Sequence, residues 1–382
     1  MAATPPAVVL LATVIVAWAE AIKLKYPGLI GFAELGTRYS RRVGLPGTAL
    51  SPFGYDGQYN YYLARDPGLV VRCAQTWAGC PFDALRDVRM ERILYPVTAR
   101  LLALGQPALI PAALLLVNLL AIAGIVVLVG KLCCDAGASR WLGAAGLYCG
   151  VILPFEIDLA DPFAVFWVVL AVYLLRKRHP LWAAAAVAAA LLTREQLLLY
   201  LPFLALPLLA QRRWRTLAAS AAIALAPFAA WQLVLRALYG HWALLAGDTS
   251  AAGLVPIPFG GLWAMRSAHD FPLLVLTVAA PMVAAGVITV LALRSDGLRG
   301  PLRDPAPLMV LAYLALLSFT APIQWADVWA TPRLAAPAIV LAVVVSVRVN
   351  RPLRLGYAAL LAATTLLPFV RDVGVVLHAL VA

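Results

Sequence analysis

A short polar stretch, residues 51–67, stands out in an otherwise apolar chain because its residue types could do acid–base chemistry. Asp56 lies near its middle, and a carboxylate there can act as a general base that removes the proton of an acceptor hydroxyl. Its neighbours Tyr55, Gln58 and Tyr59 offer aromatic faces and hydrogen-bonding groups of the kind that contact sugars. The stretch therefore predicts a polar ligand-binding site with Asp56 as its base.

The same spacing allows a structural interpretation of Asp56. A short helix running to Arg65 would begin with Asp56 as its N-cap and end at Asp66–Pro67. The sequence leaves open whether the carboxylate caps this helix or serves chemistry.

Three arginines follow in the same polar region. Arg86, Arg89 and Arg92 are three residues apart, so they would form one stripe on a helix predicted over 82–94, which breaks at Tyr95–Pro96. Guanidinium groups bind phosphate through bidentate, charge-assisted hydrogen bonds. The stripe could instead be solvated, lie on anionic headgroups, or pair with acids of its own helix.

Acidic residues gather again at the turn that holds Glu156, Asp158 and Asp161. We expect these carboxylates to contact substrate by orienting an acceptor, although they could also hold a divalent cation such as Mg²⁺ or Mn²⁺, or be solvated. The four histidines are scattered and predict no metal site.

Two further arginines interrupt apolar runs. Arg194 and Glu195 are adjacent, so their side chains should point in different directions and find different partners. We expect a functional role here, with Glu195 contacting substrate, and a tight hairpin is the structural alternative. Arg333 lies beside two tryptophans where a span begins, and it either binds phosphate or anchors the helix at the membrane interface.

The elements that position these residues are predicted to be membrane-spanning helices. Of the 382 residues 63% are hydrophobic and 13% charged, which excludes a soluble domain of this length. Because a span needs roughly 20 mostly apolar residues, we expect about eleven spans in a single transmembrane domain over residues 1–382. The first is expected over 7–19, kept rather than cleaved as a signal peptide. The others are expected near 107–130, 141–155, 162–175, 180–193, 197–210, 216–238, 272–293, 306–321, 334–347 and 355–370.

The distribution of charge predicts how these spans are oriented. A net charge of +12 would suggest a nucleic-acid partner in a soluble protein, but here basic residues cluster at alternate turns, which the positive-inside rule places in the cytoplasm. The basic turns are 131–140, 176–178, 212–215, 294–303 and 348–354. Of the 18 acidic residues, only Asp135 and Asp296 fall in these turns, and Asp304 directly follows one of them. Loops 25–105 and 239–271 then lie on the outer face, which we expect to carry the chemistry.

Five cysteines add one open question. Cys73 and Cys80 share the outer loop, where an oxidising compartment would allow a disulfide, although free thiols remain an equal alternative. The prolines, 28 in all, predict broken or kinked helices whose freed backbone groups line a cavity.

Taken together, the pattern resembles the GT-C superfamily of integral membrane glycosyltransferases, particularly bacterial members with a Tyr-Asp-Gly-Gln motif in the first outer loop. The matching elements are Tyr55-Asp56-Gly57-Gln58-Tyr59 with Ala64-Arg65-Asp66-Pro67, Arg89-Met90-Glu91-Arg92 with Tyr95-Pro96, Leu192-Thr193-Arg194-Glu195, and Pro332-Arg333 with Pro337. One departure is Asp161-Pro162, where Glu-Pro would be expected.

The resemblance implies an all-α polytopic fold with amphipathic helices in the first extracytoplasmic loop, in a bacterial plasma membrane. It implies transfer, with inversion, of a sugar from a polyprenyl-phosphate-linked donor to a glycan or lipid acceptor at the outer face. Asp56 is the position that matches the catalytic carboxylate, and the donor phosphate would contact arginines drawn from Arg89, Arg92, Arg194 and Arg333. No cofactor is required by this resemblance, and a divalent cation stays open.

Two other function classes fit parts of the sequence. A transporter or flippase for an anionic lipid could use the same arginines and broken helices, but it predicts charges along a path between the two faces and an internal inverted repeat. Neither is visible in the sequence. A non-catalytic scaffold would explain the spans but not the loop motifs.

Overall fold

The computed structural model describes residues 28–49, 51–76, 80–82, 86–245, 253–296, 300–327 and 330–381. Within these ranges the chain is helical, apart from one isolated bridge between Leu254 and Thr320. Four helical segments are long and apolar enough to cross a membrane, which indicates a helical membrane protein: Pro107–Asp135, Trp214–Tyr239, Phe271–Ser295 and Ala330–Arg348. The expected span over 7–19 lies outside the described residues. The total of about eleven spans stays a prediction, since three further apolar helices in the described ranges, Pro180–Thr193, Glu195–Ala210 and Ala306–Ser318, are shorter than the roughly 20 residues of a full crossing.

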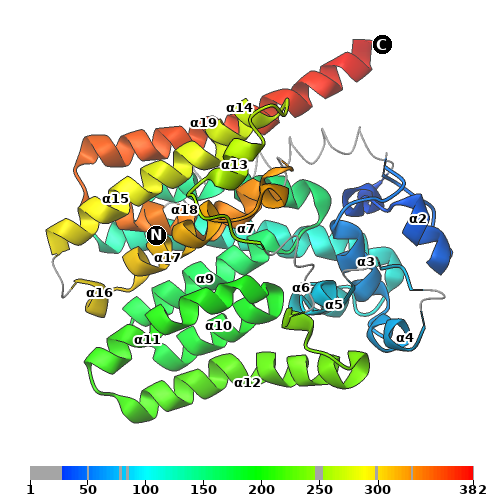
Figure 1. The fold of residues 1–382 in the computed structure, drawn as a ribbon, viewed down its shortest axis with the longest axis horizontal. Coiled ribbons are helices and arrows are strands. Elements are labelled where there is room, and N and C mark those ends of the chain that lie inside the picture. The colour runs from blue at the N-terminus through cyan, green and yellow to red at the C-terminus, as the bar shows by residue number, and fades with distance from the viewer. Residues whose placement is uncertain are drawn as a thin grey trace, which may run out of the picture.

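A bundle of apolar helices makes up most of the molecule (Figure 1). Its members are α7 (Ile110–Asp135), α9 (Asp161–Arg176), α10 (Pro180–Thr193), α11 (Leu201–Ala210), α12 (Trp214–Tyr239), α15 (Ala280–Asp296), α17 (Ala306–Ser318), α18 (Ala330–Val345) and α19 (Arg351–Val381). Short elements connect them: η3 (Pro107–Leu109), η7 (Ala243–Leu245), α13 (Gly260–Ala264), α14 (Phe271–Leu274), α16 (Gly300–Arg303), η9 (Pro322–Trp325) and η10 (Ser346–Arg348).

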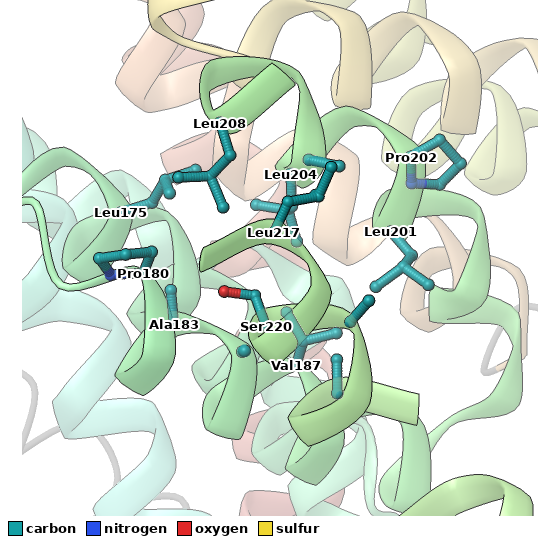
Figure 2. Close-up of a pocket in the computed structure, with 14 residues that line it drawn as sticks. Leu175, Pro180, Ala183, Val187, Leu201, Pro202, Leu204, Leu208, Leu217 and Ser220 are labelled. Atoms are coloured by element: carbon teal, nitrogen blue, oxygen red, sulfur yellow. The ribbon is translucent and has the colours of Figure 1, made fainter. Parts of the chain in front are cut away.

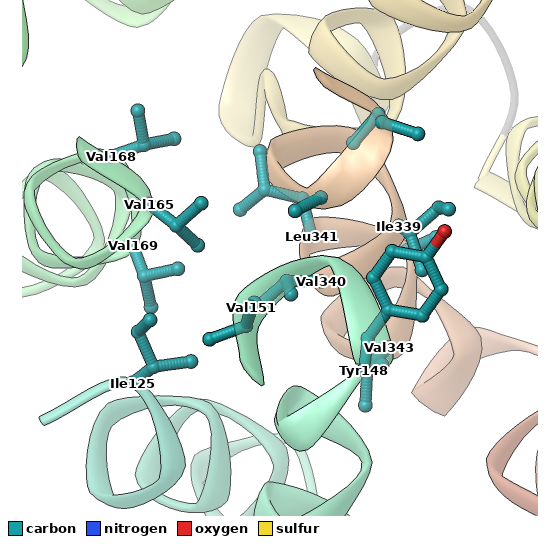
Figure 3. Close-up of a cluster of buried hydrophobic side chains, with 14 of the residues drawn as sticks. Ile125, Tyr148, Val151, Val165, Val168, Val169, Ile339, Val340, Leu341 and Val343 are labelled. Atoms are coloured by element: carbon teal, nitrogen blue, oxygen red, sulfur yellow. The ribbon is translucent and has the colours of Figure 1, made fainter. Parts of the chain in front are cut away.

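Helix α18 is the centre of the bundle. Its residues are apolar on every side and buried from Thr331 to Val345, as expected of a helix surrounded by others. It packs against α7, α9, α15 and α17, and against the short helix α8 (Cys149–Ile152). Figure 3 shows side chains of α18, such as Val340 and Leu341, meeting valines of α9 and Ile125 of α7. Whatever α18 carries at its ends is therefore held in a fixed place.

Several expected spans are broken, although Pro207, Pro227 and Pro337 lie inside helices that continue past them. The span expected over 141–155 is divided into η4 (Arg140–Leu147), α8 (Cys149–Ile152) and η5 (Leu153–Ile157). The span expected over 197–210 becomes η6 (Glu195–Tyr200) followed by α11, and a π-helical turn, η8 (Val275–Ala279), interrupts 272–293. Glycines let the divided segment 140–157 approach its neighbours: a Cβ at Gly143 would overlap the carbonyl of Val126 in α7.

The first loop folds into a helical layer at one end of the bundle, seen in blue to cyan at the right of Figure 1. Its elements are η1 (Leu29–Ala33), α2 (Thr37–Ser40), η2 (Arg41–Val43), α3 (Gly57–Arg65), α4 (Leu69–Gln75), α5 (Arg86–Met90) and α6 (Leu94–Leu102). A disulfide joins Cys73 to Cys80, which decides the question that the sequence left open. Helix α3 is buried from Gly57 to Ala64. The expectation of amphipathic helices in this loop stays a prediction.

The prediction of one helix over 82–94 is wrong in its extent, and residues 83–85 of that range lie outside the described residues. The structure instead has the short α5, a turn at Glu91, and α6 beginning at Leu94. Pro96 lies in the first turn of α6, where a missing backbone N–H costs nothing, so it helps to begin a helix rather than end one.

The second loop is described over 239–245 and 253–271, and its second part is fastened to the bundle. The backbone N–H of Val255 donates to the carbonyl of Phe319 at 2.7 Å, and that of Phe259 donates to Ser318 at 2.6 Å. Phe259 also packs its ring against Trp325. This part of the loop therefore lies against the end of α17 and η9.

Candidate functional site

Two cavities in the bundle differ in chemistry. The one in Figure 2 lies among α9, α10, α11 and α12, is lined by leucine, alanine, proline and valine, and has Ser220 as its one polar side chain. It offers no acid, base or cation. The other lies where the first loop meets the bundle, and polar side chains dominate its lining: Asp56, Tyr59, Asn60, Arg89, Arg92, Asp161, Arg194 and Arg333, with Leu159 and Ala160. This polar cavity is the candidate functional site.

Asp56 is held between two arginines of the polar cavity. Nη1 of Arg89 donates to its Oδ1 at 2.5 Å, and Nη2 of Arg333 donates to its Oδ2 at 2.9 Å. Burial alone would raise the pKa of Asp56, but the charges of Arg89 and Arg333 outweigh it and hold this pKa well below its usual range. The carboxylate is therefore ionised at neutral pH.

The structural interpretation of Asp56 as a capping side chain is wrong. Asp56 does precede the first residue of α3, but its side chain makes no capping hydrogen bond. Its side chain is 25% exposed, compared with 6% for Asp161, so Asp56 is the more accessible of the two carboxylates. The cavity has a volume of about 20 Å³, room for about one water, so a larger ligand must displace side chains that line it. The start of α3 therefore positions the carboxylate of Asp56, and no capping hydrogen bond engages its oxygens.

Two more ion pairs line the same region. Arg194, at the C-terminal end of α10, donates through Nε to Oδ1 of Asp161 at 2.9 Å. Arg92 grips Glu195 with two parallel hydrogen bonds of 2.9 and 3.1 Å. Arg194 and Glu195 therefore find different partners, as their adjacency predicted.

Arg333 joins these groups because it lies in the first turn of α18. Its Nη1 is 3.9 Å from Oδ2 of Asp161 while its Nη2 holds Asp56. The cluster contains four guanidinium groups and three carboxylates, which leaves one positive charge in excess. A buried site with excess cationic charge favours an anionic ligand.

Tyrosines complete the cavity wall. The guanidinium of Arg89 stacks 4.0 Å from the ring centroid of Tyr59, and that of Arg333 lies 5.7 Å from the ring of Tyr55. The Tyr55 hydroxyl donates to Asp327. Tyr59 therefore lines the polar cavity, and Tyr55 contacts Arg333 without lining the cavity itself.

Five residues expected to contact substrate do not line the polar cavity: Tyr55, Gln58, Glu156, Asp158 and Glu195. Tyr55 and Glu195 contact lining residues, namely Arg333 and Arg92. Gln58 is buried, accepts from the backbone N–H of Gly36 at 3.1 Å and donates to the carbonyl of Phe53 at 2.8 Å, so it fastens the loop to α3. Glu156 and Asp158 are buried in and after η5. For Asp158 only the backbone carbonyl faces a cavity residue, accepting from Asn60 at 2.9 Å.

The sequence reasoning missed two residues. Asn60 lies one helical turn beyond Asp56 on α3, and that i,i+4 spacing could have indicated a shared face. Asp327 precedes Arg333 in the same predicted outer turn, so a carboxylate beside an arginine was a usable signal.

Main-chain contacts set the position of Asp56 and Arg333. A Cβ at Gly57, next to Asp56, would overlap the carbonyl oxygen of Ile157 in η5, so α3 rests directly on that backbone. A Cβ at Gly150 in α8 would likewise overlap the carbonyl oxygen of Pro332, next to Arg333. One segment, 140–157, therefore holds both the carboxylate and its arginine.

No group of three or more His, Cys, Asp and Glu side chains arranged to hold a metal ion occurs in the part of the chain that the structure describes. The carboxylates of the polar cavity are engaged by arginines instead. Whether a divalent cation takes part stays a prediction to be tested.

Comparison of the chain with protein-family models, with curated proteins and with solved structures finds no match.

Proposed function

We propose that the protein is an inverting glycosyltransferase that moves a sugar from a polyprenyl-phosphate-linked donor to an acceptor hydroxyl at the outer membrane face. The observation that carries this proposal is Asp56, a reachable carboxylate held between Arg89 and Arg333 in a cavity with excess positive charge. Such a site combines a base for a hydroxyl with cations for a phosphate, which is what this transfer requires.

In the proposed reaction, the acceptor oxygen attacks the anomeric carbon of the donor sugar from the face opposite the phosphate. Asp56 takes the proton of the attacking hydroxyl. The bond between the anomeric carbon and the phosphate oxygen breaks, and its electron pair leaves with the lipid phosphate. Arg333, Arg194 and Arg92 stabilise the negative charge that grows on the phosphate, and this term commonly supplies the largest share of a rate gain.

The pairing of Asp56 also bears on when it acts. A carboxylate bound by two guanidinium groups is a weak base, because both charges favour its ionised form. A donor phosphate competes for Arg89 and Arg333. Donor binding would therefore raise the basicity of Asp56 and couple proton removal to the presence of the sugar.

The test is transfer from labelled polyprenyl-phosphate sugars by the purified full chain in lipid vesicles, with a membrane lipid extract as acceptor. Asp56→Asn keeps the shape of the side chain but removes the base, and should lower turnover by about 10²–10⁴-fold. The matched control is Asp304→Asn, which alters another aspartate held between two arginines, far from the polar cavity. Full turnover by Asp56→Asn would contradict the proposal.

The same vesicles test the transporter alternative. A transporter would move labelled lipid between leaflets with its mass unchanged, whereas the proposed enzyme shortens the donor by one sugar. Mass spectrometry of the lipid fraction separates the two outcomes.

A further inference from the structure

A third cavity lies at the end of the bundle away from the polar cavity. It occupies about 600 Å³ between η4 and the first turns of α19, within the 300–1,000 Å³ of many small-ligand sites. Its lining combines two arginines with an apolar wall: Arg351, Arg354, Gly137, Ala138, Ser139, Trp141, Leu142, Ala144, Ala145, Leu355, Ala358 and Ala362. We call it the α19 cavity.

The two arginines of the α19 cavity are available for an anion. Arg351 and Arg354 are three residues apart at the start of α19, so they share one face. No carboxylate in the described ranges forms a salt bridge with either. Arg354 donates one long hydrogen bond, 3.5 Å from Nη1 to the carbonyl of Val347. Arg348, one turn earlier, is by contrast bound to Asp304.

The rest of the α19 cavity suits a hydrocarbon chain. Leu355, Ala358 and Ala362 continue along α19 from the arginines, and Leu142 and Trp141 face them from η4. Trp141 is 50% exposed, as is common for a tryptophan at a membrane interface. Cationic groups at one end and apolar groups along the wall match a phosphate with an attached acyl chain, and a free phosphate would leave the wall uncovered.

We infer that the α19 cavity binds an anionic phospholipid, with its phosphate between Arg351 and Arg354 and an acyl chain along Leu355, Ala358 and Ala362. The cavity opens where the predicted cytoplasmic turns gather, and basic pockets between helices on that side bind anionic headgroups. The site is separate from the polar cavity and does not depend on the proposed reaction.

The experiment compares binding of phosphatidylglycerol and phosphatidylcholine to the purified full chain by native mass spectrometry. Each basic residue near an anionic headgroup contributes about fivefold, so a preference of about 25-fold for phosphatidylglycerol is expected. Arg351→Gln with Arg354→Gln should abolish it. The matched control, Arg213→Gln with Arg215→Gln, removes two exposed arginines from another basic turn and should leave it unchanged.

Two further variants keep the result decisive if the glutamine variant folds poorly. Arg351→Lys with Arg354→Lys keeps both charges and should retain most of the preference, whereas Ala358→Trp fills the apolar wall and should block lipid binding with both arginines intact. Equal binding of the two lipids, or an unchanged preference in the glutamine variant, would overturn the inference. Displacement of the lipid by millimolar inorganic phosphate would also overturn it, because the site would then be one for free phosphate.

Discussion

Two charged clusters of the same design lie at opposite ends of the bundle. Each places one aspartate between two arginines: Asp56 between Arg89 and Arg333, and Asp304 between Arg176 and Arg348. The same two helices contribute to both clusters. Helix α9 has Asp161 at its start and Arg176 at its end, and α18 has Arg333 in its first turn and is followed by η10, which ends at Arg348. A helix of the length of α9 separates its ends by about 24 Å.

The two clusters have the same excess of one positive charge but differ in access. Asp304 is 11% exposed and also accepts a hydrogen bond from the backbone N–H of Ala306, so it fastens α17 to its neighbours. Asp56 is 25% exposed and lines a cavity beside Arg92 and Arg194. An aspartate between two arginines is thus no sign of function by itself. The greater exposure of Asp56 and the further charged side chains around it are what distinguish the candidate site.

Arg333→Ala should separate the clusters most strongly. It removes a cation from the departing phosphate, so turnover should fall by about 10²–10³-fold, while Arg348→Ala should leave turnover per folded molecule within about threefold. Single-turnover transfer from the labelled donor measures both. Equal losses in the two variants would mean that the clusters act alike, against the proposal.

Asp161→Asn should have the next largest effect, on stability. It leaves Arg194, whose side chain is 7% exposed, without its partner, and breaking such a buried pair costs about 3 kcal/mol. Adding Arg194→Gln should recover part of the loss because no charge is then left buried. Reversible unfolding in detergent measures the free energy of each variant, and a double variant worse than the sum of the singles would contradict the pairing.

Asp304→Asn should cost less, about 1–2 kcal/mol, because Arg176 and Arg348 are 22% and 19% exposed and water can solvate them. The melting temperature should fall while transfer per folded molecule stays unchanged. Loss of activity without loss of stability would place Asp304 in the chemistry and erase the distinction between the two ends.

The smallest expected effect is on the pH dependence of stability, through Glu91 near the polar cavity. Burial, aided by the charge of Glu195, raises the pKa of Glu91 to about 8, and Gln232 donates to its Oε1 at 2.9 Å. Because the pKa of Glu91 is higher in the folded than in the unfolded chain, the contribution of Glu91 to the free energy of unfolding is greatest near pH 4. This contribution falls as the pH rises toward 8, by at most about 1.4 kcal/mol per pH unit. Glu91→Gln should flatten this slope in melting temperatures measured from pH 5 to 8. A slope unchanged by the substitution would assign it to another group.

The sequence located the charged residues of the site because a polar side chain in an apolar run is costly unless it serves a purpose. Arg194 and Arg333 were found in this way, whereas Asp56 was found from the polar stretch 51–67 and Arg92 from the spacing of the loop arginines. Their pairing could not be predicted, since Asp56 and Arg333 are 277 residues apart and no local pattern connects them. Gln58 was misassigned because a buried amide and a ligand-binding amide look the same in sequence.

The fold was predicted well where a helix is continuous and poorly where backbone contacts interrupt it. Hydropathy alone made 141–155 a span, although Gly143, Gly146 and Gly150 already indicated close approach by other backbones. Pro96 was assigned to a helix end because a proline both stops a helix and starts one, and the sequence around it favours neither.

The glycine contacts of segment 140–157 have a consequence for how such a site could diversify. Asp56 is next to Gly57, whose backbone lies against the carbonyl of Ile157. Arg333 is next to Pro332, whose carbonyl lies against the backbone of Gly150. These backbone contacts set the main-chain positions of the proposed base and of the proposed phosphate-binding arginine. Under the proposed function, the other residues that line the cavity could change to admit a different sugar or acceptor while these two main-chain positions stay the same.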